Sequence, residues 1–299
     1  MQNKHIEHPE DCILNGDLSV LNWFTADSHL SVKIDGSPAI VWGRNPANNK
    51  FFVGTKSVFN KKLIKINHNH TDVDRNHQGK VADILHLCLD NLPDTSNIYQ
   101  GDYLGCGGTN SFTPNTIRYD FADKVTQEIV IAPHTVYFAK EDLRDAIASP
   151  MDFTLIDTPY CKFVQPEVYI EEELDSIFER CKFARQVATL CEFPDSKQVT
   201  RIKKQLNTCI RQGLEIDDLT LEALASDNEI DINVLRLWEL VRSIKWDMFS
   251  HIVRDDDIEC YINDEECDHE GYVMSNDYGT FKLVDRDTFS KANFLKVRD

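Results

Sequence analysis

The first candidate site residue in this sequence is Lys33. It lies at the end of a run in which apolar residues alternate, and an Asp-Gly pair at 35–36 separates that run from a second apolar run at 39–42. Alternation on both sides of an Asp-Gly pair predicts a β-hairpin, which would hold Lys33 rigidly. A lysine attacks as the neutral amine, so a site that used Lys33 would have to depress a side-chain pKa that is ordinarily ~10.4.

A surface lysine beside an ordinary turn would give the same short pattern, so residues farther along the chain decide between the two interpretations. Residues 51–59 predict the next strand, which carries a second candidate lysine, Lys56. Residues 270–274 and 280–284 predict another hairpin, with Glu270 and Lys282 at its ends. The sequence thus predicts a carboxylate and three lysines on short strands.

The elements expected to position these residues change in type at about Pro166. Before it, apolar spacing predicts a helix at 81–92 and strands at 98–104, 118–121, 129–132 and 135–139. From 171 to 246 the apolar residues repeat with helical spacing. The fold class predicted is therefore α+β, with an antiparallel sheet region followed by a helical module.

Within the helical region, residues 196–213 show a separation of charge. Ser196 is the expected N-cap and Gly213 the expected C-terminal stop. Apolar residues fall on one side of the helix and basic residues on the other, with no acidic residue in the segment. The basic side carries Lys197, Arg201, Lys204 and Arg211. A solvated face is the ordinary interpretation, and a surface for an anionic acceptor is the alternative.

The composition favours a globular protein that works in a reducing compartment. The chain has 299 residues, 41% of them hydrophobic, and no apolar run near the roughly 20 residues that a membrane span needs. Its polar first residues predict no secretory signal, and nine cysteines without regular spacing predict free thiols. We expect a cytoplasmic location, in the host cytoplasm if a phage encodes the chain, and no membrane partner.

The net charge of −18 argues against a nucleic-acid partner, but the charges are unevenly distributed. Residues 44–80 contain eight basic and two acidic residues, whereas residues 251–270 contain nine acidic residues and one arginine. A basic region therefore follows the segment that carries Lys33.

Five short motifs in this order resemble those of the covalent nucleotidyltransferases. They are Lys33-Ile34-Asp35-Gly36, Gly54-Thr55-Lys56-Ser57, Gly101-Asp102-Tyr103-Leu104-Gly105, Glu270-Gly271-Tyr272-Val273 and Phe281-Lys282-Leu283-Val284. That superfamily comprises ATP- and NAD-dependent DNA ligases, RNA ligases and mRNA-capping enzymes. The Lys-x-Asp-Gly-Ser form followed by Thr-Lys-Ser is most similar to phage-type RNA ligases. The resemblance covers about 1–165 and 255–299.

The resemblance implies a role for each matching residue. Lys33 would attack the α-phosphate of ATP, expel pyrophosphate and form a lysyl-adenylate. Lys282 would stabilise the charge on the phosphate, and Glu270 would bind Mg²⁺ or orient the lysine. The nucleotide would be bound by Lys33, Asp35, Gly36, Lys56, Asp102, Phe138 and Lys282. Asp102, where the family usually has glutamate, is the second candidate Mg²⁺ ligand, and Phe138 is the candidate for stacking on adenine.

The chain also departs from the family pattern. Serine and proline at 37–38 stand where many members have an arginine, and Val284 stands where a second lysine is usual. Nothing after Val297 could form the OB-fold that DNA ligases and capping enzymes append, which favours an RNA-ligase-like protein.

We therefore expect an antiparallel-sheet, ATP-grasp-like ligase core at 1–165 and 251–299, interrupted by a helical insertion at 166–250. The expected function is ATP-dependent ligation of a polynucleotide, RNA rather than DNA. Transfer of the nucleotide to a protein or small molecule, guanylyl capping, and a non-enzymatic nucleotide-binding module remain as alternatives.

Overall fold

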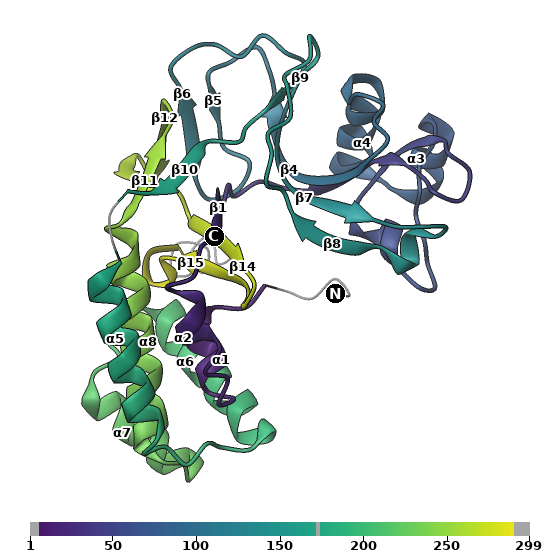
Figure 1. Cartoon of the computed structure of the whole chain (residues 1–299). Coiled ribbons are helices and arrows are strands. Elements are labelled where there is room, and N and C mark those ends of the chain that lie inside the picture. Colours follow the sequence, from purple (N-terminus) through teal and green to yellow (C-terminus); the bar gives the residue numbers. More distant parts are fainter. Residues whose placement is uncertain (1–5, 172–173, 290–299) are drawn as a thin grey trace. The chain divides into compact units, whose positions relative to one another are not determined.

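The chain forms a mixed α+β structure with several antiparallel sheets, which confirms the predicted class (Figure 1). The structure is a computed structural model that describes residues 6–171 and 174–289. Its contacts divide the chain into two compact units, neither of them continuous in sequence. The first unit contains Ile34–Pro166 and Asp256–His269. The second contains Ile6–Lys33, Glu167–Asp255 and the described residues from Glu270 on. The segment predicted as a helical insertion thus shares a unit with residues 6–33 and with the last strands.

The first unit is built around a six-stranded sheet. Its hydrogen-bonded order is β3-β2-β4-β7-β8, and β9 pairs in parallel with β7. The strands are β2 (Ala39–Arg44), β3 (Phe51–Gly54), β4 (Ile98–Cys106), β7 (Ile129–Phe138), β8 (Ile147–Pro150) and β9 (Cys161–Phe163). The two strands predicted at 129–132 and 135–139 are one strand, β7, which a bulge interrupts opposite Gln100 and Gly101.

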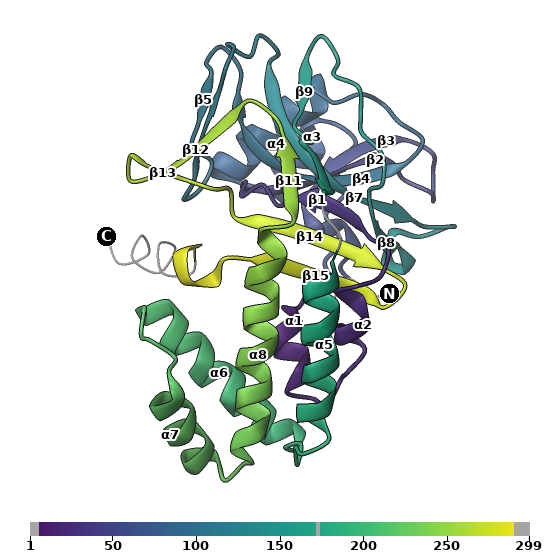
Figure 2. The ribbon, with the colours of Figure 1, turned by 60° about the vertical axis from the view of Figure 1, so that its left-hand side comes forward.

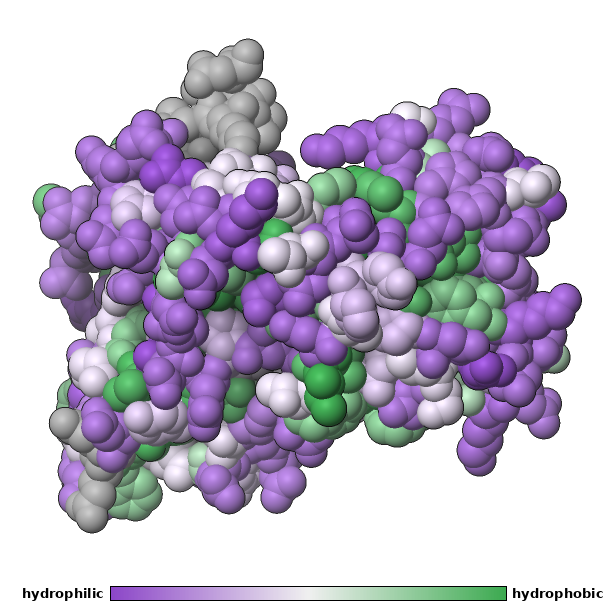
Figure 3. Space-filling model, turned by 90° about the horizontal axis from the view of Figure 1, so that it is seen from above, coloured by the Kyte–Doolittle hydropathy of each residue, from purple (hydrophilic) through white to green (hydrophobic). Residues whose placement is uncertain are grey.

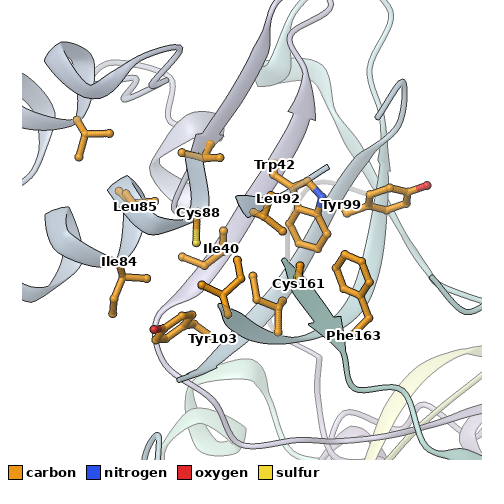
Figure 4. Packing of buried hydrophobic residues seen from close by; sticks show 14 of the residues in the cluster. Ile40, Trp42, Ile84, Leu85, Cys88, Leu92, Tyr99, Tyr103, Cys161 and Phe163 are labelled. Carbon is orange, nitrogen blue, oxygen red and sulfur yellow. The ribbon is translucent and has the colours of Figure 1, made fainter. Parts of the chain in front are cut away.

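A helix covers one face of this sheet. The helical spacing predicted at 81–92 is realised as α4 (Gly79–Asn91), which follows the short α3 (His70–Asn76). The buried side of α4 includes Leu85 and Cys88, and it packs against sheet residues such as Ile40 and Trp42 (Figure 4). The Trp42 ring stacks on Phe163 of β9, with the ring centroids 6.1 Å apart. This apolar core fixes the sheet that carries several of the candidate residues.

Short strands from two distant parts of the chain form a second sheet in the first unit. Its order is β13-β12-β6-β5, and Ile258 pairs with Phe121 across a long sequence separation. The strands are β5 (Ser111–Phe112), β6 (Arg118–Phe121), β12 (Ile258–Ile262) and β13 (Glu265–Cys267). Two 3-10 helices, η1 (Lys56–Phe59) and η2 (Leu143–Asp145), complete the unit. The strand predicted at 51–59 therefore ends at Gly54.

The hairpin predicted around Lys33 is wrong. β1 (His29–Val32) pairs with β14 (Gly271–Asn276), whereas β2 pairs with β3 and β4 in another sheet. The residues between them do not form a two-residue turn, because Ser37 N–H donates to the carbonyl of Tyr103 and Tyr103 N–H donates to that of Pro38. Pairing with β4 thus competes successfully with the local Asp-Gly signal.

The second unit combines helices with two small sheets (Figure 2). The three-stranded sheet β1-β14-β15 contains the second predicted hairpin, which is confirmed as β14 and β15 (Gly279–Val284). β10 (Glu167–Ile170) pairs with β11 (Ile252–Asp255). The helices are α1 (Pro9–Ile13), α2 (Val20–Trp23), α5 (Asp175–Ala188), α6 (Ser196–Gln212), α7 (Asp218–Asn228) and α8 (Ile232–Phe249). Helices α5 and α8 run side by side in both views.

A buried ionic network ties α1 to α8 and to the segment after β15. The fully buried carboxylate of Glu10 accepts hydrogen bonds from Lys245 at 2.6 Å and from Arg286 at 2.9 Å. Arg286 also donates to Asp11, which accepts from the indole of Trp238. Because removing one partner would leave a buried charge unpaired, this network fixes how α1 packs on α8.

Among the described helices, none has both the length and the apolar character needed to cross a membrane. The face of the molecule in Figure 3 is mostly hydrophilic, with hydrophobic residues in small patches. All nine cysteines are free thiols, five of them buried.

Candidate functional site

The three-stranded sheet of the second unit has one apolar and one polar face. Side chains that lie directly opposite each other on paired strands share a face, so the register assigns each residue. The apolar face is buried and consists of Leu30, Val32, Tyr272, Met274, Phe281 and Leu283. It packs on α2, where the rings of Trp23 and Phe281 meet edge to face at 5.1 Å. The other face, which we call the polar sheet face, carries His29, Ser31, Lys33, Val273, Ser275, Thr280 and Lys282.

Lys33 contacts Glu270 on this sheet. Lys33 follows β1 directly and continues its ladder, because its N–H donates to the carbonyl of Gly271 at 2.8 Å. Glu270 directly precedes β14, and its carboxylate forms an ion pair with the Lys33 ammonium. The two side chains are 24% and 17% exposed, so the pair is shielded but still reachable from solvent. Two residues 237 positions apart are thus brought together as the antiparallel register requires.

Lys282 lies on the same face as Lys33, one row away. Residues that lie directly opposite one another across the three strands form one row. Lys282 is in a row with Val273 and Ser31. Lys33 lies beside Gly271 and is therefore in the next row, with Val284. β14 separates the two lysine-bearing strands, which places them about 10 Å apart. The position where the resembling family usually has its second lysine is thus a buried valine in the row of Lys33.

The backbone conformation and the close packing at position 271 require glycine. Its φ is +135°, a conformation that other residues rarely adopt, and a Cβ there would lie 2.1 Å from the carbonyl oxygen of Leu283. The backbones of β14 and β15 approach closely here, immediately beside Lys33 and Glu270.

In the first unit, Asp35 contacts the connection between β5 and β6, and Gly36 contacts β4. The Asp35 carboxylate accepts hydrogen bonds from the amide of Asn115 at 3.1 Å and from the N–H of Thr116 at 3.4 Å. A Cβ on Gly36 would lie 2.8 Å from the Cβ of Asp102, so this residue also has to be glycine. The structure thus brings Asp35, Gly36 and Asp102 to the same end of the six-stranded sheet.

Asp102 has a neighbour that the sequence interpretation missed, His134. The bulge in β7 falls at His134, whose Nε2 lies 3.8 Å from a carboxylate oxygen of Asp102. Its Nδ1 is 2.7 Å from the hydroxyl of Thr135. The sequence does carry a signal for this bulge, because the alternation of apolar and polar residues is broken between residues 132 and 135. Bulges often redirect a side chain next to a functional site. His29, on the polar sheet face, was missed because no motif includes it.

Lys56 and Phe138 lie at different ends of the first unit's sheet. Lys56 is exposed and begins η1 directly after β3, whose Gly54 pairs with Val41, close to the Asp102 end. Phe138 is the last residue of β7, six residues and about 20 Å beyond the Ala132 that pairs with Asp102. It is 61% exposed and lines an open cavity of about 700 Å³ together with residues such as Arg44 and Lys140. The structure does not bring Phe138 to Asp102.

The basic side of α6 is exposed. Lys197, Arg201, Lys204 and Arg211 all face solvent, and none of them has an ion-pair partner in the described part of the chain. Val199, Ile202, Leu206 and Ile210 are buried on the opposite side. The N-cap is Asp195 rather than the predicted Ser196, because the Asp195 carboxylate accepts from the N–H groups of Lys197 and Gln198 in a capping box. Gly213 ends the helix in a left-handed conformation, as predicted.

The model of a family described as one of unknown function (DUF6267) matches residues 3–221 and 215–298, which is nearly the whole chain. No curated protein and no solved structure matches the chain.

Proposed function

The chain belongs to this family of unknown function, and from its own residues we propose that it is an ATP-dependent nucleotidyltransferase that ligates a polynucleotide. The observation that carries the proposal is the ion pair between Lys33 and Glu270, with Lys282 on the same face of the small sheet as Lys33. The five motifs that resemble those of covalent nucleotidyltransferases supply the reaction type.

In the proposed reaction, the ammonium of Lys33 gives one proton to solvent, and the neutral Nζ then forms a bond to the α-phosphorus of ATP and releases a second proton to solvent. The bond from that phosphorus to the bridging oxygen breaks, and pyrophosphate leaves. Glu270, which contacts Nζ, would orient the amine, and Lys282 would stabilise the charge that develops on the phosphate oxygens. A 5′-phosphate of the acceptor would then take the adenylate from Lys33, and a 3′-hydroxyl would displace AMP.

Glu270 and Asp102 have the chemistry that a Mg²⁺ ligand needs. Mg²⁺ in phosphoryl-transfer sites is held by one or two carboxylates together with substrate phosphates and water. Each of these carboxylates is partly exposed, and each is held on a strand or beside one. Bound Mg²⁺ would add positive charge beside the α-phosphate. The cation would also disfavour a protonated Lys33, because like charges repel.

The proposed acceptor is RNA. The exposed basic side of α6 and the basic segment 44–80 could neutralise phosphates in a chain that is otherwise strongly acidic. The net charge of −18 favours a second candidate, in which the nucleotide passes from Lys33 to a protein or a small molecule. Both candidates share the first step, so that step is tested first.

The experiment is label transfer from α-labelled ATP in the presence of Mg²⁺. We expect the purified protein to become covalently labelled through a bond that acid breaks and alkali does not, as for a phosphoramidate. Lys33→Ala should abolish the label. Lys182→Ala is the matched control, because Lys182 is an exposed lysine of the same unit that pairs with Glu179 on α5.

Equal labelling of the Lys33→Ala variant and the wild type would refute the proposal. Labelling by GTP but not by ATP would replace it with capping-type chemistry. Labelling without any ligation of nicked or single-stranded RNA would favour transfer to a protein or a small molecule.

A further inference from the structure

A pair of histidines on the first unit has an arrangement that the proposed function does not use. His70 begins α3 and His86 lies on α4, the helix that packs beside it. Their Nδ1 atoms are 2.7 Å apart. The ring planes differ by only 23°, and the ring centroids are 5.0 Å apart. The distance between the ring centroids is close to the sum of the Nδ1–Nδ1 distance and the two ring radii. The two Nδ1 atoms therefore lie on the line that joins the centroids, and the rings face each other edge to edge.

A carboxylate lies on the far side of each ring. Nε2 of His70 is 3.1 Å from an oxygen of Asp90, and Nε2 of His86 is 3.0 Å from an oxygen of Asp74. An ionised carboxylate only accepts hydrogen bonds, so both Nε2 atoms carry the proton. In the neutral rings both Nδ1 atoms then present lone pairs to each other at 2.7 Å, an arrangement that a positive ion between them would stabilise.

We propose that His70 and His86 form a binding site for a divalent transition-metal ion. Imidazole is a favoured ligand of Zn²⁺, Ni²⁺ and Cu²⁺. Histidines that bind such ions usually donate their other N–H to a carboxylate, which fixes the tautomer and the ring orientation, and both rings do so here. The inference stands on these contacts alone and is independent of the proposed nucleotidyl transfer.

An ion between the two Nδ1 atoms requires the rings to move. With bonds of 2.0–2.1 Å, two in-line nitrogen ligands would lie about 4.1 Å apart, so the rings would separate by about 1.4 Å. A tetrahedral Zn²⁺ needs a nitrogen–nitrogen distance of about 3.3 Å, and each ring would then also turn by roughly 35° so that its lone pair points at the ion. The side chains of His70 and His86 are 54% and 28% exposed, which leaves room for that movement and a path for the ion. Within residues 6–171 and 174–289, no three His, Cys, Asp or Glu side chains converge on one ion position. Water would therefore complete the coordination.

The site can be tested by titrating the intact protein with Zn²⁺ in a calorimeter, with histidine NMR spectra to locate the ion. We expect His70→Gln and His86→Gln each to remove one bound equivalent. Asp90→Asn should weaken binding by about 10–100-fold, as is typical when the partner of a ligating histidine is lost. His68→Gln is the control, because His68 lies near this pair in sequence but its Nδ1 contacts the carbonyl of Phe51.

Zinc bound at any of the nine free cysteines would be present in every variant, so it would not affect the difference in bound equivalents between the variants and the wild type. Selective shifts of the His70 and His86 resonances in the wild type, lost in both variants, would support the site. Unchanged stoichiometry in His70→Gln and His86→Gln would overturn it. So would a wild-type titration in which these two resonances respond to pH but not to Zn²⁺, since the pair would then share a proton only.

Discussion

The contribution of the Lys282 side chain to the rate of covalent labelling can be measured by its removal. This lysine lies one row from Lys33 on the same face, so it is placed to stabilise charge on a phosphate bound there. We expect Lys282→Ala to slow covalent labelling by ATP about 100-fold or more, because removal of one stabilising donor typically costs that much. The rate of label transfer under single-turnover conditions measures it. Lys182→Ala should label at the wild-type rate, and a Lys282→Ala rate within twofold of wild type would exclude this role.

The glycine beside Lys33 provides a prediction on stability. Gly271→Ala combines a strained φ of +135° with a contact of 2.1 Å to a carbonyl oxygen. We expect it to lower the free energy of unfolding by about 2–4 kcal/mol, measured by urea denaturation. Gly79→Ala is the control for backbone strain alone, since Gly79 has a φ of +59° with no atom within 4 Å of its Cβ position. That change should cost only about 1 kcal/mol. Equal losses for the two variants would contradict the role of the close approach.

At the scale of one element, charge reversals on α6 can test acceptor binding separately from nucleotide transfer. Arg201 and Lys204 are exposed and have no ion-pair partner in the described residues. If they contact phosphates, Arg201→Glu/Lys204→Glu should weaken RNA binding at least about tenfold. The slope of log K against log salt should fall by about 1.4, the value for two contacts to a single strand. Fluorescence anisotropy over a range of salt concentrations measures both quantities.

The control for α6 matches the change in charge. Lys182→Glu/Arg236→Glu alters the net charge equally on α5 and α8, where both residues are exposed. It should leave the salt slope unchanged, and both double variants should still form the covalent adenylate. If the α6 variant keeps full RNA affinity, the basic side of α6 does not bind RNA and is an ordinary solvated face.

Elements set by local pattern could be predicted from the sequence, and elements set by distant pairing could not. The helical spacing located α4 and α6, and the last hairpin was predicted because its strands are neighbours in sequence. The hairpin at Lys33 failed because β1 finds its partner in β14, more than 230 residues away. The Asp-Gly pair could not reveal that competitor.

The candidate site divides in the same way. Lys33, Glu270 and Lys282 were chosen by motif order. The structure pairs Lys33 with Glu270 and places Lys282 on the same sheet face as Lys33. His134 was missed because its position next to Asp102 depends on a bulge in the β4–β7 register. Phe138 was chosen by residue type alone, which carries no information about its distance along β7.

For the whole molecule, the pH dependence of stability should report the burial of His8. Burial lowers the pKa of His8 to about 2; nearby Glu10 raises it, and Arg286, Lys245 and Lys282 lower it. An unfolded chain would protonate this histidine below about pH 6.5, whereas the folded protein would not. The unfolded state therefore binds more protons between these values, and stability falls as the pH drops from about 6.5.

The contribution of His8 is at most about 1.4 kcal/mol per pH unit. We expect His8→Gln to show a shallower loss of stability between pH 6.5 and 5 than the wild type, measured by urea denaturation at several pH values. This range lies above the usual pKa values of carboxyl groups, so their protonation contributes little. Parallel curves for the two proteins would show that folding does not lower the pKa of His8.

The interleaving of the two units sets the order in which a ribosome can complete them. β1 leaves the ribosome early, but its partner β14 is synthesised more than 230 residues later. At 5–20 residues per second this delay is roughly 10–50 s, far longer than a hairpin needs to form. During synthesis β1 lacks β14, the strand with which it pairs, and Lys33 lacks the carboxylate of Glu270. The pair of Lys33 and Glu270 is therefore among the last contacts to form, and a chain truncated before Glu270 cannot form it.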